Sequence, residues 1–395
     1  MSETNIVMVV IDAFRPDHLS MFGYGKETDA NLKRIAKDSI LFRNQFSVSN
    51  ATAPAVTSIF SGLLPSSHGV IHQFPYTKPE EFDKVESIGF WLPSYLKDKG
   101  YETMAFDWIG FWFEKGFDYY KESEVELEGL FPPTKMTVDL AISKIKKAKR
   151  PFFAFLHLWD THFPFPNTLY KGSGANESEK ILASIKDEKQ KEYVTNRMNA
   201  AKLYSVQDVA DKYDETIRII DQEVGRLYDF LKSENLLENT IVVILGDHGD
   251  IIHEHGIYFS HCGMFEGSVR APMIIKLPGV RAKETGEMVQ NIDIVPTILD
   301  FLGDKPAKEL DGKSLLPLIK NGTKVRDEVL LFDGLANDVR AVRTGKKKLV
   351  VAKDSFCNLC KSSHHHDTEE YDLANDPAET KNIFSGSSEL SKSMR

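Results

Sequence analysis

The chain has 395 residues, of which 42% are hydrophobic and 27% charged, as is typical of a folded globular protein and not of a disordered or collagen-like chain. This length suits two domains, or one large α/β enzyme domain with an appendage. The 49 basic and 58 acidic side chains give a net charge of −9, which argues against binding to nucleic acid or to an anionic membrane surface.

The chain begins with a short acidic segment that leads directly into an apolar run. Residues 1–4 do not resemble the basic start of a secretory signal, and the longest unbroken apolar run, at 6–11, is far shorter than the ~20 residues of a membrane span. Three cysteines are too few for a dense disulfide framework. We therefore expect a cytoplasmic enzyme without a membrane span.

Short apolar runs then alternate with helical patterns. Runs that end in polar residues predict buried parallel strands at 5–11, 151–157, 240–245 and 271–278. Helices are predicted at 29–38, 88–99, 138–147, 212–233 and 292–302. This alternation predicts an α/β sheet with helices on both faces, and ligands bind such sheets beyond the carboxyl ends of the strands.

Two segments differ from this pattern. Residues 171–207 are polar and rich in Lys and Glu, which predicts a solvated helical insertion that either projects as an arm or covers the site as a lid. After residue 303 the composition changes, and 339–353 reads as a basic hairpin. We expect a catalytic domain at 1–305 that contains the insertion, followed by a small α+β subdomain at 306–395.

Three residues at predicted strand ends could bind a metal. Asp12 follows the first strand, and Asp247 and His248 follow the third. Carboxylate and imidazole ligands suit Zn²⁺ or Mn²⁺, whereas an oxygen-rich set would suit Ca²⁺ or Mg²⁺. A lone Asp at a strand end is more often a helix cap or a turn residue than a metal ligand, so the joint pattern is what favours a metal site.

The segment from Thr52 to Gly69 contains Thr-x-Pro, then Ser-Gly, Pro and His-Gly at wider spacing. It resembles the nucleophile motif of the sulfatase branch of the alkaline phosphatase superfamily. Further stretches similar to that family lie at 11–12, 157–164, 246–272 and 370–382, so the likeness covers almost the whole chain. It implies an alkaline-phosphatase-like sandwich with a mainly parallel central sheet flanked by helices and a small C-terminal α+β subdomain.

The departures from the family pattern concern chemistry. Sulfatases oxidise a Cys or Ser to formylglycine, whereas position 52 is Thr, and the motif's Arg falls at Val56. The sulfate-binding Lys and His expected after Thr103 are absent, and His261 stands where a later sulfate-contacting Lys would be. These differences argue against a formylglycine sulfatase.

A Thr nucleophile resembles the phosphodiesterase, phosphonate monoester hydrolase and phosphoglycerol transferase members of the superfamily. The resemblance implies one or two divalent metal ions per chain, Mn²⁺ or Zn²⁺ being favoured over Ca²⁺, held by Asp12, Thr52, Asp247 and His248. A metal can stabilise the Thr52 alkoxide, and turnover would then pass through a covalent phospho-Thr52 intermediate. A phosphodiester or phosphonate monoester is favoured because no dense basic cluster awaits a dianion.

The resemblance leaves the role of three further residues open. Asp160, His162 and His261 would hold a second metal in two-metal members, whereas in one-metal members His162 and His261 would act as general acid and phosphoryl clamp. The Asp-x-His spacing favours one metal. Asn50, Asp107 and Trp108 are candidate substrate-binding residues, and capping of a loop is the alternative role for Asn50. The aromatic run at 108–120 either lines a substrate groove or packs on the sheet.

Two alternatives remain for the function. One is a sulfuric ester hydrolase that works without formylglycine, and the other is a catalytically silent protein that binds a ligand. The substrate would be a small-molecule or glycan phosphate or sulfate ester, and the sequence leaves the oligomeric state open, a homo-oligomer included.

Cys357 and Cys360 precede three consecutive histidines, His364 to His366, in a spacing similar to a zinc knuckle. Only one Cys-x-x-Cys pair is present, so we expect an exposed loop, with a structural Zn²⁺ site as the alternative.

Overall fold

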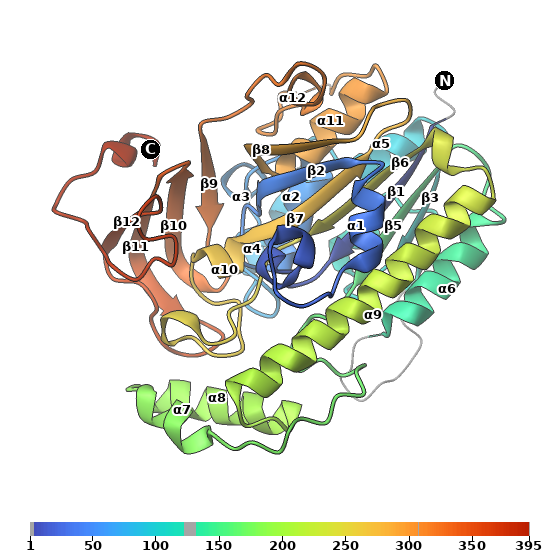
Figure 1. The fold of residues 1–395 in the computed structure, drawn as a ribbon. Helices are drawn as coiled ribbons and strands as arrows, with labels where there is room; N and C mark the ends of the chain where they lie inside the picture. The colour runs from blue at the N-terminus through green and yellow to red at the C-terminus, as the bar shows by residue number, and fades with distance from the viewer. Residues whose placement is uncertain (1–3, 122–131, 307, 395) are drawn as a thin grey trace.

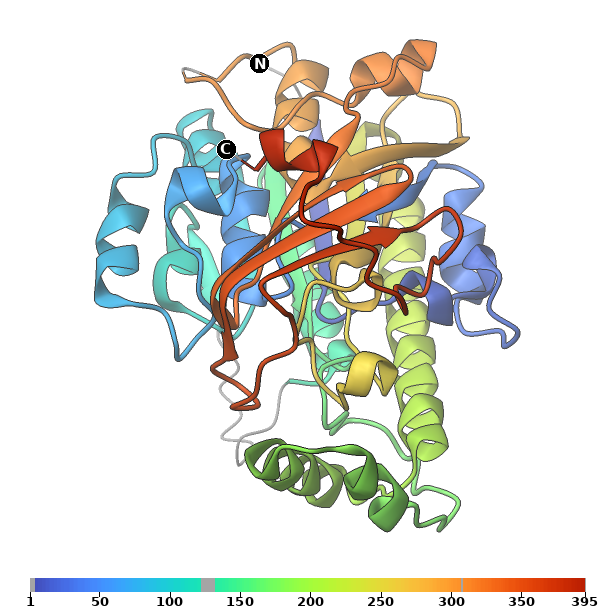
Figure 2. The ribbon, with the colours of Figure 1, turned by 90° about the vertical axis from the view of Figure 1, so that its left-hand side faces the viewer.

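The computed structural model describes residues 4–121, 132–306 and 308–394, which form two sheets flanked by helices (Figures 1 and 2). The large sheet has eight strands in the order β4-β3-β5-β1-β6-β7-β2-β8. Their bounds are β1 Asn5–Ile11, β2 Ile40–Phe46, β3 Glu102–Phe106, β4 Tyr119–Lys121, β5 Phe152–Leu158, β6 Thr240–Gly246, β7 Arg270–Lys276 and β8 Lys283–Gln290. The predicted α/β architecture with a mainly parallel sheet is confirmed.

One predicted strand runs in the opposite direction. The run at 271–278 was expected to be parallel, but β7 is antiparallel to both of its neighbours, β6 and β2. A parallel partner would need a crossover that returns the chain to the other end of the sheet. The connection at 247–269 holds only the short helical turns η5 (Glu254–Gly256) and α10 (Glu266–Val269) among its described elements, so the chain turns back beside β6.

Alternate residues of β1 face two separate apolar clusters. Val7 and Val9 pack with α1 (Ala30–Ala36), α6 (Thr134–Ile145) and α9 (Val206–Ser233). Ile6 and Met8 pack on the other face with α2 (Thr52–Ser61), α5 (Leu92–Asp98), α11 (Ile294–Phe301) and α12 (Leu316–Asn321). The short helices α3 (Pro65–His68) and α4 (Pro79–Glu86) lie between α2 and α5 in the chain. Because strand side chains alternate, one strand anchors helices on both faces.

The second sheet is antiparallel, in the order β12-β11-β10-β9. Its bounds are β9 Glu328–Phe332, β10 Ala336–Thr344, β11 Lys347–Cys357 and β12 Thr368–Asp372, so the hairpin predicted at 339–353 is confirmed. The domain boundary at 305/306 stays a prediction. α12 follows that boundary yet packs in the same apolar cluster as α11.

The segment predicted as an insertion contains α7 (Ser178–Ser184) and α8 (Glu188–Ala201). Figures 1 and 2 show both helices away from the large sheet, at the N-terminal end of α9. Val194 and Met198 of α8 join the apolar cluster that contains Val209 and Tyr213 of α9. No described helix is both long and apolar enough to span a bilayer.

Candidate active site

Four polar side chains meet where four neighbouring parallel strands end. Asp107 follows β3, His157 is the penultimate residue of β5, Asp12 follows β1, and Asp247 follows β6. These strands lie side by side in the order β3-β5-β1-β6. All four side chains are buried, with at most 3% of their surface exposed. The predicted convergence of Asp12 and Asp247 at the carboxyl edge of the sheet is therefore observed.

Each of the two aspartates near the centre has one satisfied and one open oxygen. Asp247 Oδ1 accepts hydrogen bonds from the backbone N–H groups of His248 (2.7 Å) and Ala13 (3.2 Å), and Asp12 Oδ2 accepts one from Thr52 Oγ1 (3.0 Å). Asp247 Oδ2, Asp12 Oδ1 and His157 Nε2 are buried without a hydrogen-bond partner among the described residues. Such orphaned buried atoms call for a ligand.

A divalent cation fits these open atoms. Ligand atoms of Asp12, His157 and Asp247 all lie within 4.8 Å of one another. Burial, followed by repulsion from Asp247, raises the pKa of Asp12 well above its usual range, and burial raises that of Asp247 to about 6. Two adjacent buried carboxylates are costly unless a positive charge offsets them. Asp12, His157 and Asp247 can thus hold a metal ion, and the identity of that metal stays a prediction.

Thr52 lies against this set as the first residue of α2. Its Oγ1 is 3.2 Å from His248 Nε2 and 3.0 Å from Asp12 Oδ2, so two of the predicted metal ligands contact the predicted nucleophile. A helix N-terminus also favours negative charge, such as an alkoxide or a phosphoryl oxygen. Val56, one turn along α2, is fully buried in the apolar cluster beneath the sheet, so nothing there replaces the arginine of the sulfatase motif.

The histidines of the site share one hydrogen-bonding pattern. The Nδ1 atoms of His248, His261 and His162 lie 2.5–2.7 Å from the carbonyl oxygens of Gly249, Asn50 and Phe163, in that order. A carbonyl only accepts, so each Nδ1 carries the proton and each Nε2 carries the lone pair. A Cβ at Gly249 would lie 2.0 Å from the Gly267 carbonyl oxygen, so the backbone here requires glycine.

His261 and His162 lie beside His248. The His261 ring stacks on the His248 ring with 4.7 Å between centroids. Burial, followed by the charge of His248, lowers the pKa of His261 to about 3, and burial, Arg197 and His261 together lower that of His162. Both rings are therefore neutral near pH 7 in the ligand-free protein. An anionic ester placed between them would raise both pKa values.

Asp160, His162 and His261, the predicted ligands of a second metal, do not cluster as Asp12, His157 and Asp247 do. Asp160 Oδ2 accepts from the backbone N–H of Thr134 at 2.8 Å. Within the described ranges, metal-type ligand atoms gather in two groups, and neither group contains Asp160, His162 or His261. A role for these residues in a second metal stays a prediction.

The three predicted substrate-binding residues have different surroundings. Asn50 Nδ2 donates to His261 O, Gly263 O and Asp333 Oδ1, which favours a role in holding the His261 loop. Asp107 Oδ1 lies 3.0 Å from His157 Nδ1, which favours a role in orienting a metal ligand. Trp108 is 38% exposed beside the site. Substrate contact by these residues remains a prediction.

His157 and Arg197 were not predicted as site residues, although His157 begins the family-like stretch at 157–164. His157 interrupts an otherwise apolar strand one residue before its end, and that interruption was the available signal. Arg197 comes from α8, where no strand or motif marked it. Its guanidinium lies over the Phe163 ring, 4.0 Å from the centroid, and its Nε donates to Phe259 O. It is close enough to lower the pKa values of both His162 and His261.

Part of the aromatic run at 108–120 packs on the sheet, and a role of the run in lining a substrate groove stays a prediction. Trp112 and Phe113 are buried in the cluster on the α2 side of the sheet, and Trp112 Nε1 donates to Thr57 Oγ1 at 3.0 Å. Trp108 and Phe111 are 38% and 61% exposed.

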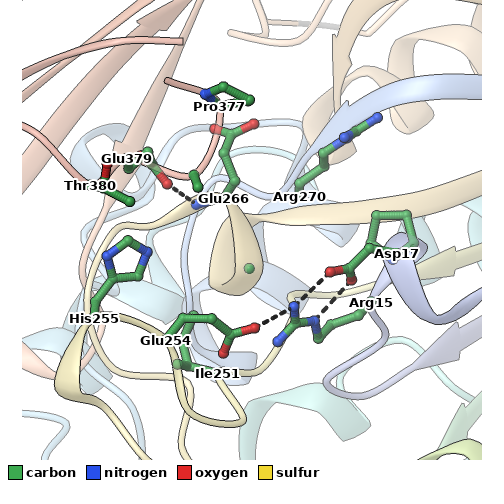
Figure 3. Close-up of a pocket in the computed structure, with 13 residues that line it drawn as sticks. Arg15, Asp17, Ile251, Glu254, His255, Glu266, Arg270, Pro377, Glu379 and Thr380 are labelled. Carbon is green, nitrogen blue, oxygen red and sulfur yellow. Dashed lines mark hydrogen bonds and ion pairs between the residues drawn. The ribbon is translucent and has the colours of Figure 1, made fainter. Parts of the chain in front are cut away.

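A pocket of about 730 Å³ lies next to the metal site (Figure 3). Arg15 on its wall forms ion pairs with Asp17 (2.6 Å) and Glu254 (2.7 Å), and Glu379 Oε2 accepts from the Glu266 backbone N–H. None of the residues around Thr52 lines this pocket. Arg15 is held by these two carboxylates and no residue of the predicted site lines the pocket, so we assign the pocket no catalytic role.

The fold and the site define an ester hydrolase of the alkaline phosphatase superfamily. The chain belongs to the sulfatase family: the Sulfatase family model matches residues 4–304, and the model described as N-sulphoglucosamine sulphohydrolase, C-terminal matches residues 253–394.

Named relatives and solved structures share this fold. An N-acetylglucosamine-6-O-sulfatase of Bacteroides thetaiotaomicron is 23% identical over 99% of this chain and 84% of its own length. An ulvan-active sulfatase of Formosa agariphila is 24% identical over 84% of this chain, which spans 58% of that longer protein. A crystal structure of the phosphonate monoester hydrolase of Agrobacterium radiobacter superposes with a TM-score of 0.70 at 18% identity, covering 99% of this chain and 93% of the other.

Proposed function

We propose that this sulfatase-family hydrolase cleaves phosphoryl esters with Thr52 as its nucleophile, and that phosphodiesters or phosphonate monoesters are its preferred class. The observation that carries the proposal is the position of Thr52 Oγ1, 3.0 Å from Asp12 Oδ2 and 3.2 Å from His248 Nε2, against the open atoms of the Asp/His metal site. A threonine cannot become formylglycine, so the hydroxyl itself must react.

Asp12, His157 and Asp247 would hold the divalent cation, with Thr52 and His248 completing the set. When bound, the cation supplies Lewis-acid chemistry that lowers the pKa of the Thr52 hydroxyl and offsets charge on the phosphoryl oxygens. Imidazole ligands favour Mn²⁺ or Zn²⁺ over Ca²⁺. The oxygen of Asp12 that accepts from Thr52 also fixes the direction of the nucleophile.

The reaction proceeds in two displacements. Thr52 Oγ, after releasing its proton to solvent, attacks phosphorus, the bond to the leaving oxygen breaks, and the departing alkoxide takes a proton from His162 or His261. Water then attacks phospho-Thr52 and gives one proton back to that imidazole. The Thr52 oxygen leaves as the alkoxide that began the reaction. His162 and His261 can be protonated for the first step because the anionic ester raises their pKa values.

Arg197 supports a substrate with an anionic centre. The motif arginine and the sulfate-binding lysine of the family are absent at Val56 and His261, so α8 supplies the positive charge that faces His162 and His261. A single guanidinium, with the cation, suits a monoanionic ester better than a dianion.

Cleavage of sulfate esters is the second candidate, because the named relatives include sulfatases that share most of this chain. A small-molecule or glycan ester would suit either reaction. A silent binding protein is disfavoured because the nucleophile and its surrounding ligands are complete.

The test is hydrolysis of aryl phosphodiester, phosphonate monoester, phosphate monoester and sulfate ester panels with Mn²⁺, Zn²⁺ or Ca²⁺. Thr52→Val, which keeps the shape of the side chain, should lower turnover of the phosphorus ester by about 10³-fold or more, and Thr52→Ser should restore part of it. Acid quenching should trap a phosphorylated peptide that contains Thr52. Thr57→Val removes a hydroxyl from the next turn of α2 and serves as the control.

Full activity of Thr52→Val would contradict the proposed nucleophile. Turnover of sulfate esters alone, lost in the same variant, would establish the second candidate. A protein that binds metal but is silent on every ester in the panel would place its substrate outside these classes.

A further inference from the structure

All three cysteines of the chain meet at one point, although they are far apart in sequence. Cys262 lies in the loop between α10 and η5, next to His261, whereas Cys357 ends β11 and Cys360 lies in the loop that follows. The prediction that Cys357 and Cys360 lie in an exposed loop is wrong. Their side chains are only 1% and 2% exposed, and Cys262 is fully buried. β11 and its loop fold back against the 260–265 segment, which buries them.

His364 completes the group. Ligand atoms of Cys262, Cys357, Cys360 and His364 all lie within 4.8 Å of one another. Cys262 Sγ is 3.4 Å from Cys357 Sγ, and Cys360 Sγ is 2.8 Å from His364 Nε2. The pair at 3.4 Å is too long for a disulfide, which requires about 2.05 Å. Tetrahedral zinc with Zn–S bonds of about 2.3 Å places its sulfurs about 3.8 Å apart, close to the spacing observed.

The loop after β11 holds three of these ligands in place. Cys357 N donates to Ser362 O (2.8 Å), and Lys361 N donates back to Cys357 O (3.0 Å). Lys361 adopts the left-handed region, with φ at 58°, which closes the tight turn between Cys360 and His364. The loop therefore presents Cys-x-x-Cys-x-x-x-His to one point.

The fourth ligand comes from the loop of the active site. The Asn50 amide binds the carbonyls of His261 and Gly263, on both sides of Cys262, and so fixes its position. An apolar cluster alone explains three buried cysteines, but it does not explain an imidazole nitrogen aimed at one of them. Soft thiolates with one imidazole are the ligands that zinc prefers.

We propose that Cys262, Cys357, Cys360 and His364 bind a structural Zn²⁺ ion that fastens the C-terminal sheet to the loop carrying His261. Four protein ligands leave no open position, so this ion would not take part in hydrolysis. It is separate from the Asp12 site in both ligand type and residues. Its loss would loosen the loop beside the active site.

The first test is the metal content of the purified full chain by mass spectrometry. The Asp247→Asn variant, with its catalytic metal site disabled, should retain about one zinc per chain after dialysis, and adding Cys360→Ser to that variant should remove most of this zinc. His366→Ala is the matched control, because His366 neighbours the group without belonging to it. Cobalt added to the zinc-free protein should give a thiolate-to-cobalt charge-transfer band, which an oxygen and nitrogen site cannot produce.

A second measurement needs no variant. The thiols of the wild-type protein should resist alkylation until a strong chelator is added and should then react together. Absence of the cobalt band, with thiols equally protected before and after chelation, would overturn the proposal. A Cys262–Cys357 disulfide in the non-reduced protein, or retention of zinc by the Asp247→Asn/Cys360→Ser double variant, would also overturn it.

Discussion

Replacing Asp107 with Asn tests how the metal site is held. Asp107 Oδ1 lies 3.0 Å from His157 Nδ1, and its Oδ2 accepts from Tyr120 Oη at 2.6 Å. Burial by itself would raise the pKa of Asp107, yet the pKa lies below its usual range because His157 and Tyr120 stabilise the carboxylate. Asparagine keeps an acceptor toward His157 but removes the charge, which makes the imidazole a weaker ligand.

The expected loss follows from the burial of this pair. Both side chains are fully buried, so solvent does not screen their interaction. Losing the carboxylate that orients a metal-binding histidine typically lowers metal affinity about 10–100-fold, or about 1.4–2.7 kcal/mol. Tyr120→Phe keeps the carboxylate and removes one hydrogen bond, so a loss of only about 0.5–1.5 kcal/mol is expected.

The assay is titration of metal-free Asp107→Asn, Tyr120→Phe and wild-type protein with Mn²⁺ or Zn²⁺ by calorimetry, together with KM for the best ester. A raised Kd for metal, with KM unchanged at saturating metal, supports the role in orienting His157. An unchanged Kd with a raised KM would refute this reasoning and place Asp107 in contact with the substrate.

Three further predictions concern stability and substrate binding. Arg197→Met should lower kcat/KM for the anionic ester about 10–100-fold, as expected for a lost charge-assisted bond. Lys189→Met, on the exposed side of α8, should leave kcat/KM unchanged. Equal kcat/KM values for the two variants would exclude a role of Arg197 in binding the substrate. Lys348 is fully buried and forms an ion pair with Glu379 at 2.6 Å. Lys348→Met should therefore lower the free energy of unfolding, measured in urea, by about 3–5 kcal/mol. A decrease below about 1 kcal/mol would contradict the stability assigned to this ion pair. Burial lowers the pKa of His68 to about 3, so the unfolded chain binds more protons and stability falls as the pH drops below about 6.5. Between about pH 7.5 and about pH 5 that loss is about 2 kcal/mol, it should vanish in His68→Gln, and an identical pH dependence in the variant would rule out His68 as its source.

The sequence predicted the α/β class, four of the eight strands of the large sheet and half of the site. Asp12 and Asp247 were predicted because each follows an apolar run, and strand ends in a parallel sheet share one edge. Thr52 was identified by its motif. The direction of β7 could not be predicted from the sequence, because an apolar run has the same pattern in a parallel and in an antiparallel strand.

The missed residues depend on contacts between distant segments. Arg197 and Cys262 reach their partners through loops and helices whose placement is set by packing, and no local pattern encodes that. The cysteine group needed a contact across 95 residues between Cys262 and Cys357. The cytoplasmic location stays a prediction.

The position of Arg197 separates the choice of substrate from the metal-binding centre of the active site. The metal ligands are fixed to strands in the core, where a change of residue disturbs packing on both faces of the sheet. Arg197 stands on α8, in a segment that Figure 1 shows outside the sheet. With Arg197 in its proposed role, substitutions in 171–207 would change which esters are accepted while the reaction centre stays intact. A library limited to this segment is the natural starting point for evolving new specificity in this enzyme.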